Sequence, residues 1–172
     1  MNSGSKYDLP ADSEWAQWLA RYAPALLLFA RQQTGGEADA RDLVQDAVVE
    51  SWRRQDNGAP PPLGLVYATI RHRAVDLARR NERRLDREVA AHLDRPPCWF
   101  DSGLDERERD MLIQKAMSNL PEIYRAVVTL KVWGGLTFGE IAETLEIPAN
   151  TAASRYRYGL IELRKLTREV FA

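Results

Sequence analysis

Apolar residues recur every three or four positions along most of the chain, which is the spacing of one buried face of an α-helix. The first such stretch begins near Asp12, and Pro24 interrupts it, so we expect a kinked helix or two abutting helices. Its apolar positions are Trp15, Trp18, Leu19, Tyr22, Leu26, Phe29 and Ala30. Gly35 and Gly36 should end this stretch, and Asp39 is expected to cap the next helix.

A second helix is predicted over residues 40–54, and its outer face is unusually acidic. The positions expected to be buried are Leu43, Val44, Ala47, Val48 and Trp52. The positions expected to face solvent are Asp42, Gln45, Asp46, Glu50 and Arg53. No basic run lies nearby in the sequence to pair with these carboxylates. The face is therefore more acidic than stability needs, which favours a docking surface over a merely solvated one.

A turn-rich loop is predicted over 57–62, because three consecutive prolines disfavour helix. A third helix then begins at about Leu63. Its expected buried positions are Leu63, Val66, Tyr67, Ile70, Ala74 and Leu77. Its other side carries Arg71, His72, Arg73, Asp76, Arg79, Arg80 and Arg83. A row of arginines can bind a polyanion, and a solvated helix face is the alternative.

The pattern fades after this helix and returns near Asp105, which predicts two helical domains joined by a flexible linker. Cys98, Trp99 and Phe100 are the one apolar cluster of the linker, and they could dock on either domain or on a partner. Two further helices are expected, over 105–119 and from Ile123 to Gly134. The predicted class is all-α, with a disordered tail over 1–10, a first domain over 11–84, a linker over 85–104 and a second domain over 105–172.

The last part of the chain predicts a helix–turn–helix. Thr137 and Glu140 form a capping box, in which each side chain satisfies a backbone donor of the other residue at a helix start. The helix that follows should end at Glu146, and Pro148 should open the next one, where its missing N–H costs nothing. In that next helix Ala152, Tyr156, Leu160 and Leu163 are expected to face inward. Asn150, Ser154, Arg157 and Tyr158 should share the outer face, with Arg155 beside them.

Composition narrows the possible functions. The 172 residues carry 24 basic and 25 acidic side chains, so neither charge is in excess. The basic and acidic residues are instead concentrated in separate stretches of the chain. The single cysteine excludes an internal disulfide, and no secretory signal or membrane span is predicted, so we expect a cytoplasmic protein. No catalytic group, cofactor loop or metal-ligand spacing is recognisable. Asp42 and Asp46 could hold a cation, but a partner-facing or solvated surface is the stronger interpretation.

Two separate signatures resemble one family. The run 120–125, then 136–142 and 150–155, resembles region 4 of bacterial RNA polymerase sigma factors of the extracytoplasmic-function group. Upstream, the runs 21–24 and 39–46 with Trp52, followed by 67–80, resemble region 2 of the same group. The resemblance covers residues from about 15 to 166, in the order that the family has. It implies a protein that is not an enzyme and that binds core polymerase and promoter DNA.

The resemblance also implies roles for individual residues. The clamp of the polymerase would be contacted by Asp42, Gln45, Asp46 and Glu50. The melted −10 element would be contacted by Arg71, His72, Arg73, Asp76, Arg79, Arg80 and Arg83, with the 57–62 loop near a flipped base. The −35 element would be read by Asn150, Thr151, Ser154, Arg155, Arg157 and Tyr158. Region 4 would also bind the polymerase flap, and an anti-sigma factor is a further candidate partner.

Three departures from the family pattern affect specificity. Glu146 stands where the family often has glycine, so the turn is expected to be shaped differently, because a non-glycine residue in the left-handed region costs roughly 1 kcal/mol. Ala152 and Ala153 replace a usual valine and cation, and His72 replaces a usual asparagine. The alternative function is a dimeric helix–turn–helix regulator that never binds core polymerase. A sigma-shaped adaptor without promoter activity is a third.

Overall fold

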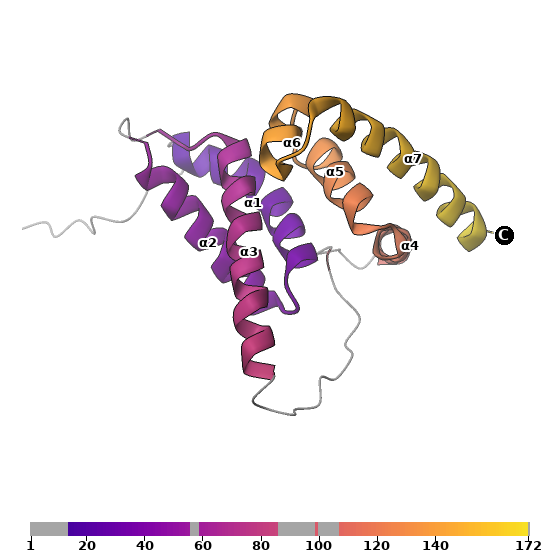
Figure 1. Cartoon of the computed structure of the whole chain (residues 1–172), viewed down its shortest axis with the longest axis horizontal. Helices are drawn as coiled ribbons and strands as arrows, with labels where there is room; N and C mark the ends of the chain where they lie inside the picture. Colours follow the sequence, from indigo (N-terminus) through magenta and orange to yellow (C-terminus); the bar gives the residue numbers. More distant parts are fainter. Residues whose placement is uncertain (1–13, 56–58, 86–98, 100–106, 172) are drawn as a thin grey trace, which may run out of the picture.

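In a computed structural model, seven α-helices make up nearly all of the described part of the chain, which comprises residues 14–55, 59–85, 99 and 107–171. They are α1 (Glu14–Gln33), α2 (Glu37–Arg53), α3 (Leu63–Leu85), α4 (Arg107–Asn119), α5 (Glu122–Val132), α6 (Phe138–Leu145) and α7 (Ala149–Phe171). No strand occurs within those residues, so the predicted all-α class is confirmed. Figure 1 shows α1–α3 grouped in one half of the molecule and α4–α7 in the other.

The first half is a three-helix unit whose core lies between α1, α2 and α3. Leu26 and Phe29 from α1, and Tyr67 and Ile70 from α3, are fully buried. The rings of Phe29 and Tyr67 meet edge to face, with centroids 5.4 Å apart. Pro24 lies within α1, so the first apolar stretch is one helix and not two abutting ones.

The structure corrects two details of α2. The helix starts at Glu37 with Gly36 as N-cap, and no side chain caps it, so the prediction that Asp39 is the cap was wrong. Glu37 instead pairs with Arg31 at the end of α1, 2.7 Å from Oε2 to Nε, which holds the two helix ends together and starts α2 earlier. Trp52 was predicted to be buried, but 41% of it is exposed. Its ring packs edge to face on Trp15 at the rim of the unit.

The second half contains the predicted helix–turn–helix in α6 and α7. The capping box is confirmed: Thr137 Oγ1 accepts from the Glu140 amide at 3.2 Å, and the Thr137 amide donates to Glu140 Oε2 at 2.7 Å. Leu160 is 42% exposed, so its predicted inward orientation was wrong. Gly159 occupies the buried position, where an added Cβ would lie 2.9 Å from Val128 Cγ2. The close approach of α5 to α7 at this glycine turns Leu160 out to solvent.

The two halves pack against each other. Residues from both belong to one apolar cluster, including Val66 and Ile70 from α3 and Ile141 and Leu145 from α6. Thr144 Oγ1 donates to the Gly64 carbonyl at 3.4 Å, and Thr129 Oγ1 donates to Gln32 Oε1 at 2.9 Å. The contacts of α3 with α6 place the start of α3, the helix predicted to contact melted DNA, directly beside the helix–turn–helix. The sequence had left the placement of the two domains open.

Candidate nucleic-acid interface

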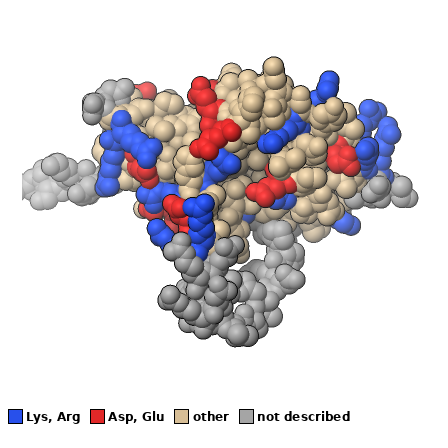
Figure 2. Space-filling view, viewed as in Figure 1, with Lys and Arg blue, Asp and Glu red and all other residues tan. Residues whose placement is uncertain are grey.

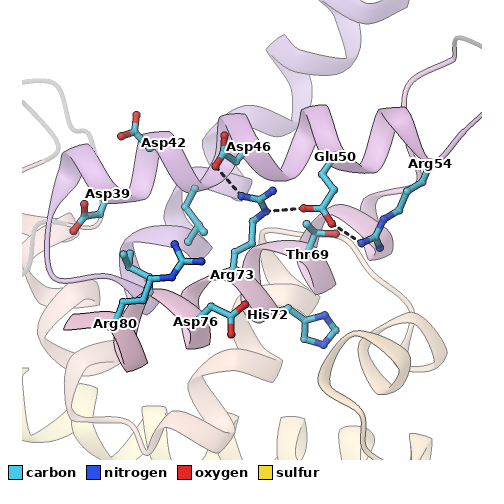
Figure 3. Close-up of a pocket in the computed structure, with 12 residues that line it drawn as sticks. Asp39, Asp42, Asp46, Glu50, Arg54, Thr69, His72, Arg73, Asp76 and Arg80 are labelled. Carbon is cyan, nitrogen blue, oxygen red and sulfur yellow. Dashed lines mark hydrogen bonds and ion pairs between the residues drawn. The ribbon is translucent and has the colours of Figure 1, made fainter. Parts of the chain in front are cut away.

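Three of the predicted docking residues of α2 and four of the predicted DNA residues of α3 line the two walls of a groove of about 460 Å³ (Figure 3). Its lining residues are Asp39, Asp42, Leu43, Asp46, Glu50 and Arg54 from the α2 side, and Thr69, His72, Arg73, Asp76, Leu77 and Arg80 from α3. On the face of the molecule that Figure 2 shows, acidic and basic side chains lie side by side over the half that contains α1–α3. The groove is therefore mixed in charge.

Arg73 links the two walls. Its Nη1 lies 2.8 Å from Asp46 Oδ2, and its Nε lies 2.6 Å from Glu50 Oε2, while Arg54 also pairs with Glu50 (Figure 3). The hydrogen bond from Arg73 holds the pKa of Glu50 below its ordinary value. The expectation that the α2 carboxylates lack basic partners was wrong for Asp46 and Glu50. Packing of α2 on α3 brings Arg73 to the acidic face, beside Glu50, which lies 23 positions earlier in the chain.

A second groove lies on α2, toward α1, and it is apolar. It has a volume of about 350 Å³ and is lined by Leu19, Ala23, Leu27, Arg41, Val44, Gln45, Val48 and Val49. Gln45 therefore lies apart from Asp46 and Glu50, and the predicted polymerase-binding residues divide between two faces of one helix. Val44 and Val48, predicted to be buried, are only partly covered. The sequence feature that indicates this groove is the apolar stripe on α2, which is wider than packing against the core requires.

The remaining predicted DNA residues of α3 extend along an exposed side of the helix. Arg79 and Arg80 are exposed, and Arg79 Nη1 lies 4.0 Å from Asp76 Oδ1, the separation of a loose surface pair. Arg71 is half-buried. Arg83 belongs to α3, but its side chain lies outside the described residues. Of the predicted flipped-base loop, residues 56–58 also lie outside the described part.

His72 and Glu146 are in contact with each other. His72 Nε2 lies 2.9 Å from Glu146 Oε1, and this hydrogen bond holds the pKa of Glu146 below its ordinary value. Glu146 adopts φ 56° and ψ 47°, and its amide donates to the carbonyls of Ala142 and Glu143. The turn thus keeps the left-handed conformation that glycine would supply, and the expectation of a differently shaped turn was wrong. Two of the three departures from the family pattern are partners across the contact of α3 with the turn.

The first turns of α7 present the predicted −35 residues to solvent. A shallow hollow of about 340 Å³ is lined by Asn150, Thr151, Ser154, Arg155 and Tyr158 from α7, and by Ile123 and Tyr124 from α5. Arg157 lies outside this set, and its guanidinium carbon is 5.1 Å from the Tyr158 ring centroid. Arg155 and Arg157 therefore border the Ser154 and Tyr158 face on opposite sides, as helical spacing dictates.

No group of three or more histidine, cysteine or acidic side chains among the described residues is arranged to hold a metal ion. None of the described helices is long and apolar enough to span a membrane.

Comparison with known proteins agrees with this arrangement. Residues 18–84 match the family model for sigma-70 region 2, and residues 110–163 match that for sigma-70 region 4. The ECF RNA polymerase sigma factor SigE of Mycolicibacterium smegmatis is 27% identical over 166 residues, which are 91% of this chain and 63% of SigE. SigL of Mycobacterium tuberculosis is 28% identical over 155 residues, covering 87% of this chain and 86% of SigL.

A solved structure shares the fold. The sigma factor RpoE from Bartonella quintana, crystallised with the anti-sigma factor NepR, superposes with a TM-score of 0.64 at 22% identity, covering 90% of this chain and 97% of RpoE. The two matched regions define a two-domain, helix–turn–helix transcription protein. With both regions matched in order, the chain belongs to the extracytoplasmic-function group of RNA polymerase sigma factors.

The Arg73 bridge predicts a defined acid dependence of folding. Because the pKa of Glu50 is lowered in the folded state, its contribution is complete above its ordinary value of 4.5 and is lost as pH falls through the lowered pKa. Glu50→Gln should therefore cost up to about 1 kcal/mol in unfolding free energy at pH 7, and it should flatten the decline below pH 4.5. Urea titrations across pH 3–7 measure both. In an Arg73→Met background the same substitution should have a smaller effect on both, because only the Arg54 pair with Glu50 remains, and an undiminished effect there would contradict the assignment.

Proposed function

We propose that this protein binds core RNA polymerase and directs it to specific promoters, with α3 contacting melted −10 DNA and α7 reading the −35 element. The observation that carries the proposal is the ordered pair of family matches on two helical domains. Region 4 by itself would leave a dimeric regulator open, since many repressors use a helix–turn–helix. The match to region 2 over residues 18–84, which are most of α1–α3, favours the sigma factor.

Core polymerase is proposed to dock on the apolar groove of α2 beside Gln45, and to reach Asp42, which lines the neighbouring groove between α2 and α3. Asp46 and Glu50 are engaged by Arg73, and a partner would have to break those pairs to use them. Gln45 lies instead beside an open apolar groove, and an apolar surface with a polar margin is what a protein interface requires. This refines the predicted set of Asp42, Gln45, Asp46 and Glu50 by assigning the last two mainly to the α2–α3 contact.

Promoter DNA is proposed to meet two separated surfaces. Among the described side chains of α3, the exposed arginines are Arg79 and Arg80, whereas Arg73 faces α2 and His72 faces Glu146. On α7 the exposed set around Ser154 and Tyr158 would enter the major groove, where the pattern of donors and acceptors is unique to each base pair. The polymerase flap is proposed as a second contact of the region 4 domain.

An anti-sigma factor is a further proposed partner. RpoE, which shares the fold, was crystallised with the anti-sigma factor NepR, and this supports a regulator of the same kind here. A cytoplasmic location is proposed because core polymerase and promoters lie there. The decisive experiment is transcription by core polymerase plus this protein on a library of genomic fragments. Start sites that appear only when the protein is added support the proposal, and their absence contradicts it.

The docking proposal predicts different effects for the two sides of α2. Asp42→Lys combined with Val48→Asp should weaken binding to core polymerase about tenfold or more, by reversing a charge and placing another in the apolar groove. Asp46→Asn should leave that affinity within about twofold and lower thermal stability slightly instead. Affinity is measured with fluorescently labelled protein. Equal losses from both changes would mean that polymerase uses the Arg73 side as well.

The α3 proposal predicts a salt signature. Arg79→Ala or Arg80→Ala should reduce open-complex formation, and each lost phosphate contact should lower the slope of log affinity against log salt by roughly 0.7 to 0.9. Arg53→Ala, which removes an exposed cation from the end of α2, is the matched control and should leave the slope unchanged. Permanganate footprinting of the bubble across salt concentrations measures the effect. An identical slope for all three variants rules out phosphate contact by the α3 arginines.

The placement of Arg155 and Arg157 predicts separable roles at the −35 element. Arg157→Ala should change the preferred base at one position, losing about 1–3 kcal/mol of discrimination if its guanidinium binds a guanine edge. Arg155→Ala should weaken all promoters nearly equally, because it is placed for the phosphate backbone. Randomised upstream elements selected with each holoenzyme give the two preferences. A changed preference for Arg155→Ala, with none for Arg157→Ala, reverses the assignment.

A further inference from the structure

Trp99 lies between the two domains, although it comes from the segment that separates them in the sequence. It is 5% exposed and belongs to an apolar cluster with Leu28 from α1, Met117 from α4 and Val128 from α5. A tryptophan buries more apolar surface than any other side chain can. Trp99 therefore places the largest available side chain at a junction that both domains share.

The backbone of Trp99 is also held from both sides. Its carbonyl accepts a buried hydrogen bond of 2.8 Å from Arg31 Nη1 on α1, and its amide donates to Gln114 Oε1 on α4 at 2.9 Å. The guanidinium of Arg125 lies over the indole ring, 5.2 Å from the centroid. Arg31 is in turn fixed by its bidentate pair with Glu37. One residue thus receives a hydrogen bond from the first domain and gives one to the second.

The polar contacts elsewhere between the domains are weaker. His72 and Glu146 are both largely exposed, and the Thr144 to Gly64 bond is long at 3.4 Å. Gln32 accepts from Thr129 across the boundary, but its buried Nε2 has no hydrogen-bond partner. An unsatisfied buried donor destabilises the contact that buries it. Apart from the apolar surface shared by α3 and α6, the interface therefore relies heavily on Trp99.

The closed arrangement is incompatible with simultaneous contact to both promoter elements. On the proposed sigma function, the −35 and −10 elements are centred about 25 base pairs apart, which is roughly 85 Å at 3.4 Å per base pair. A compact protein of this length has a radius of gyration of about 16 Å. The domains must separate before α3 and α7 can occupy the two elements together, and separation withdraws Trp99 from at least one of its two hydrogen-bond partners.

We propose that Trp99 is an interdomain clamp that holds the free protein closed, and that its release accompanies assembly on the promoter. Clamping reduces the fraction of molecules that is open and competent to bind. The apparent affinity for core polymerase is the intrinsic affinity multiplied by that fraction. Loosening the clamp therefore raises apparent affinity without adding any contact to the polymerase.

Small-angle X-ray scattering of the full chain tests the clamp without polymerase. Trp99→Ala should increase the radius of gyration from about 16 Å to above about 22 Å, the value for two small domains that have moved apart. Circular dichroism should show unchanged helix content. Trp99→Phe, which keeps an aromatic ring in the apolar cluster and beneath the Arg125 guanidinium, should stay close to the wild type. Trp52→Ala is the matched control, because it removes a tryptophan from the rim of the first domain only.

Arg125→Ala decides the matter if Trp99→Ala also loses helix content. Removing the cation over the indole should give a smaller expansion in the same direction, and a wild-type radius would then overturn the proposal. A folded Trp99→Ala protein as compact as the wild type overturns it as well. The second readout rests on the proposed sigma function: Trp99→Ala should bind core polymerase about tenfold more tightly. If no variant binds polymerase, the sigma function fails, whereas the scattering result still judges the clamp.

Discussion

The packing of α3 against α6 is the contact on which the rest of the molecule depends. It joins the core of α1–α3 to that of the helix–turn–helix through one apolar cluster that includes Val66, Ile70, Ile141 and Leu145. Burial of such side chains is non-directional, so the cluster brings the domains together without fixing their register. The polar contacts at its edges, from Gly64 to Thr144 and from His72 to Glu146, supply that register.

Two residues of α3 that are predicted to contact DNA are engaged within the protein. His72 binds Glu146 across the contact between the domains, whereas Arg73 would have to give up its ion pairs with Asp46 and Glu50 on α2 to reach DNA. Each such pair lies near solvent, where ion pairs contribute little, so a competing polyanion can replace them. On the proposed function, these intramolecular partners would lower the affinity of the free protein for DNA while remaining easy to displace.

Glu146 has a strained backbone conformation that the surrounding fold maintains. A glutamate in the left-handed region is strained relative to glycine, yet the turn keeps that geometry because its amide caps α6 and its neighbours Leu145 and Ile147 pack inward. The carboxylate then becomes available to His72 on the facing helix. The substitution therefore converts a turn that only connects two helices into one that also contacts the other domain.

The sequence by itself determined the helices, their order and the two domains, because periodicity and capping are local properties. The capping box at Thr137 and the stripe of Val66, Tyr67 and Ile70 needed no knowledge of distant residues. The tertiary structure decided which side chains have partners within the protein and which face solvent. Arg73 reaches Asp46, Gly159 displaces Leu160 from the core, and Trp99 joins both domains, all through residues far apart in the chain. Such pairings depend on how helices pack, and helical spacing does not encode which face of one helix meets another.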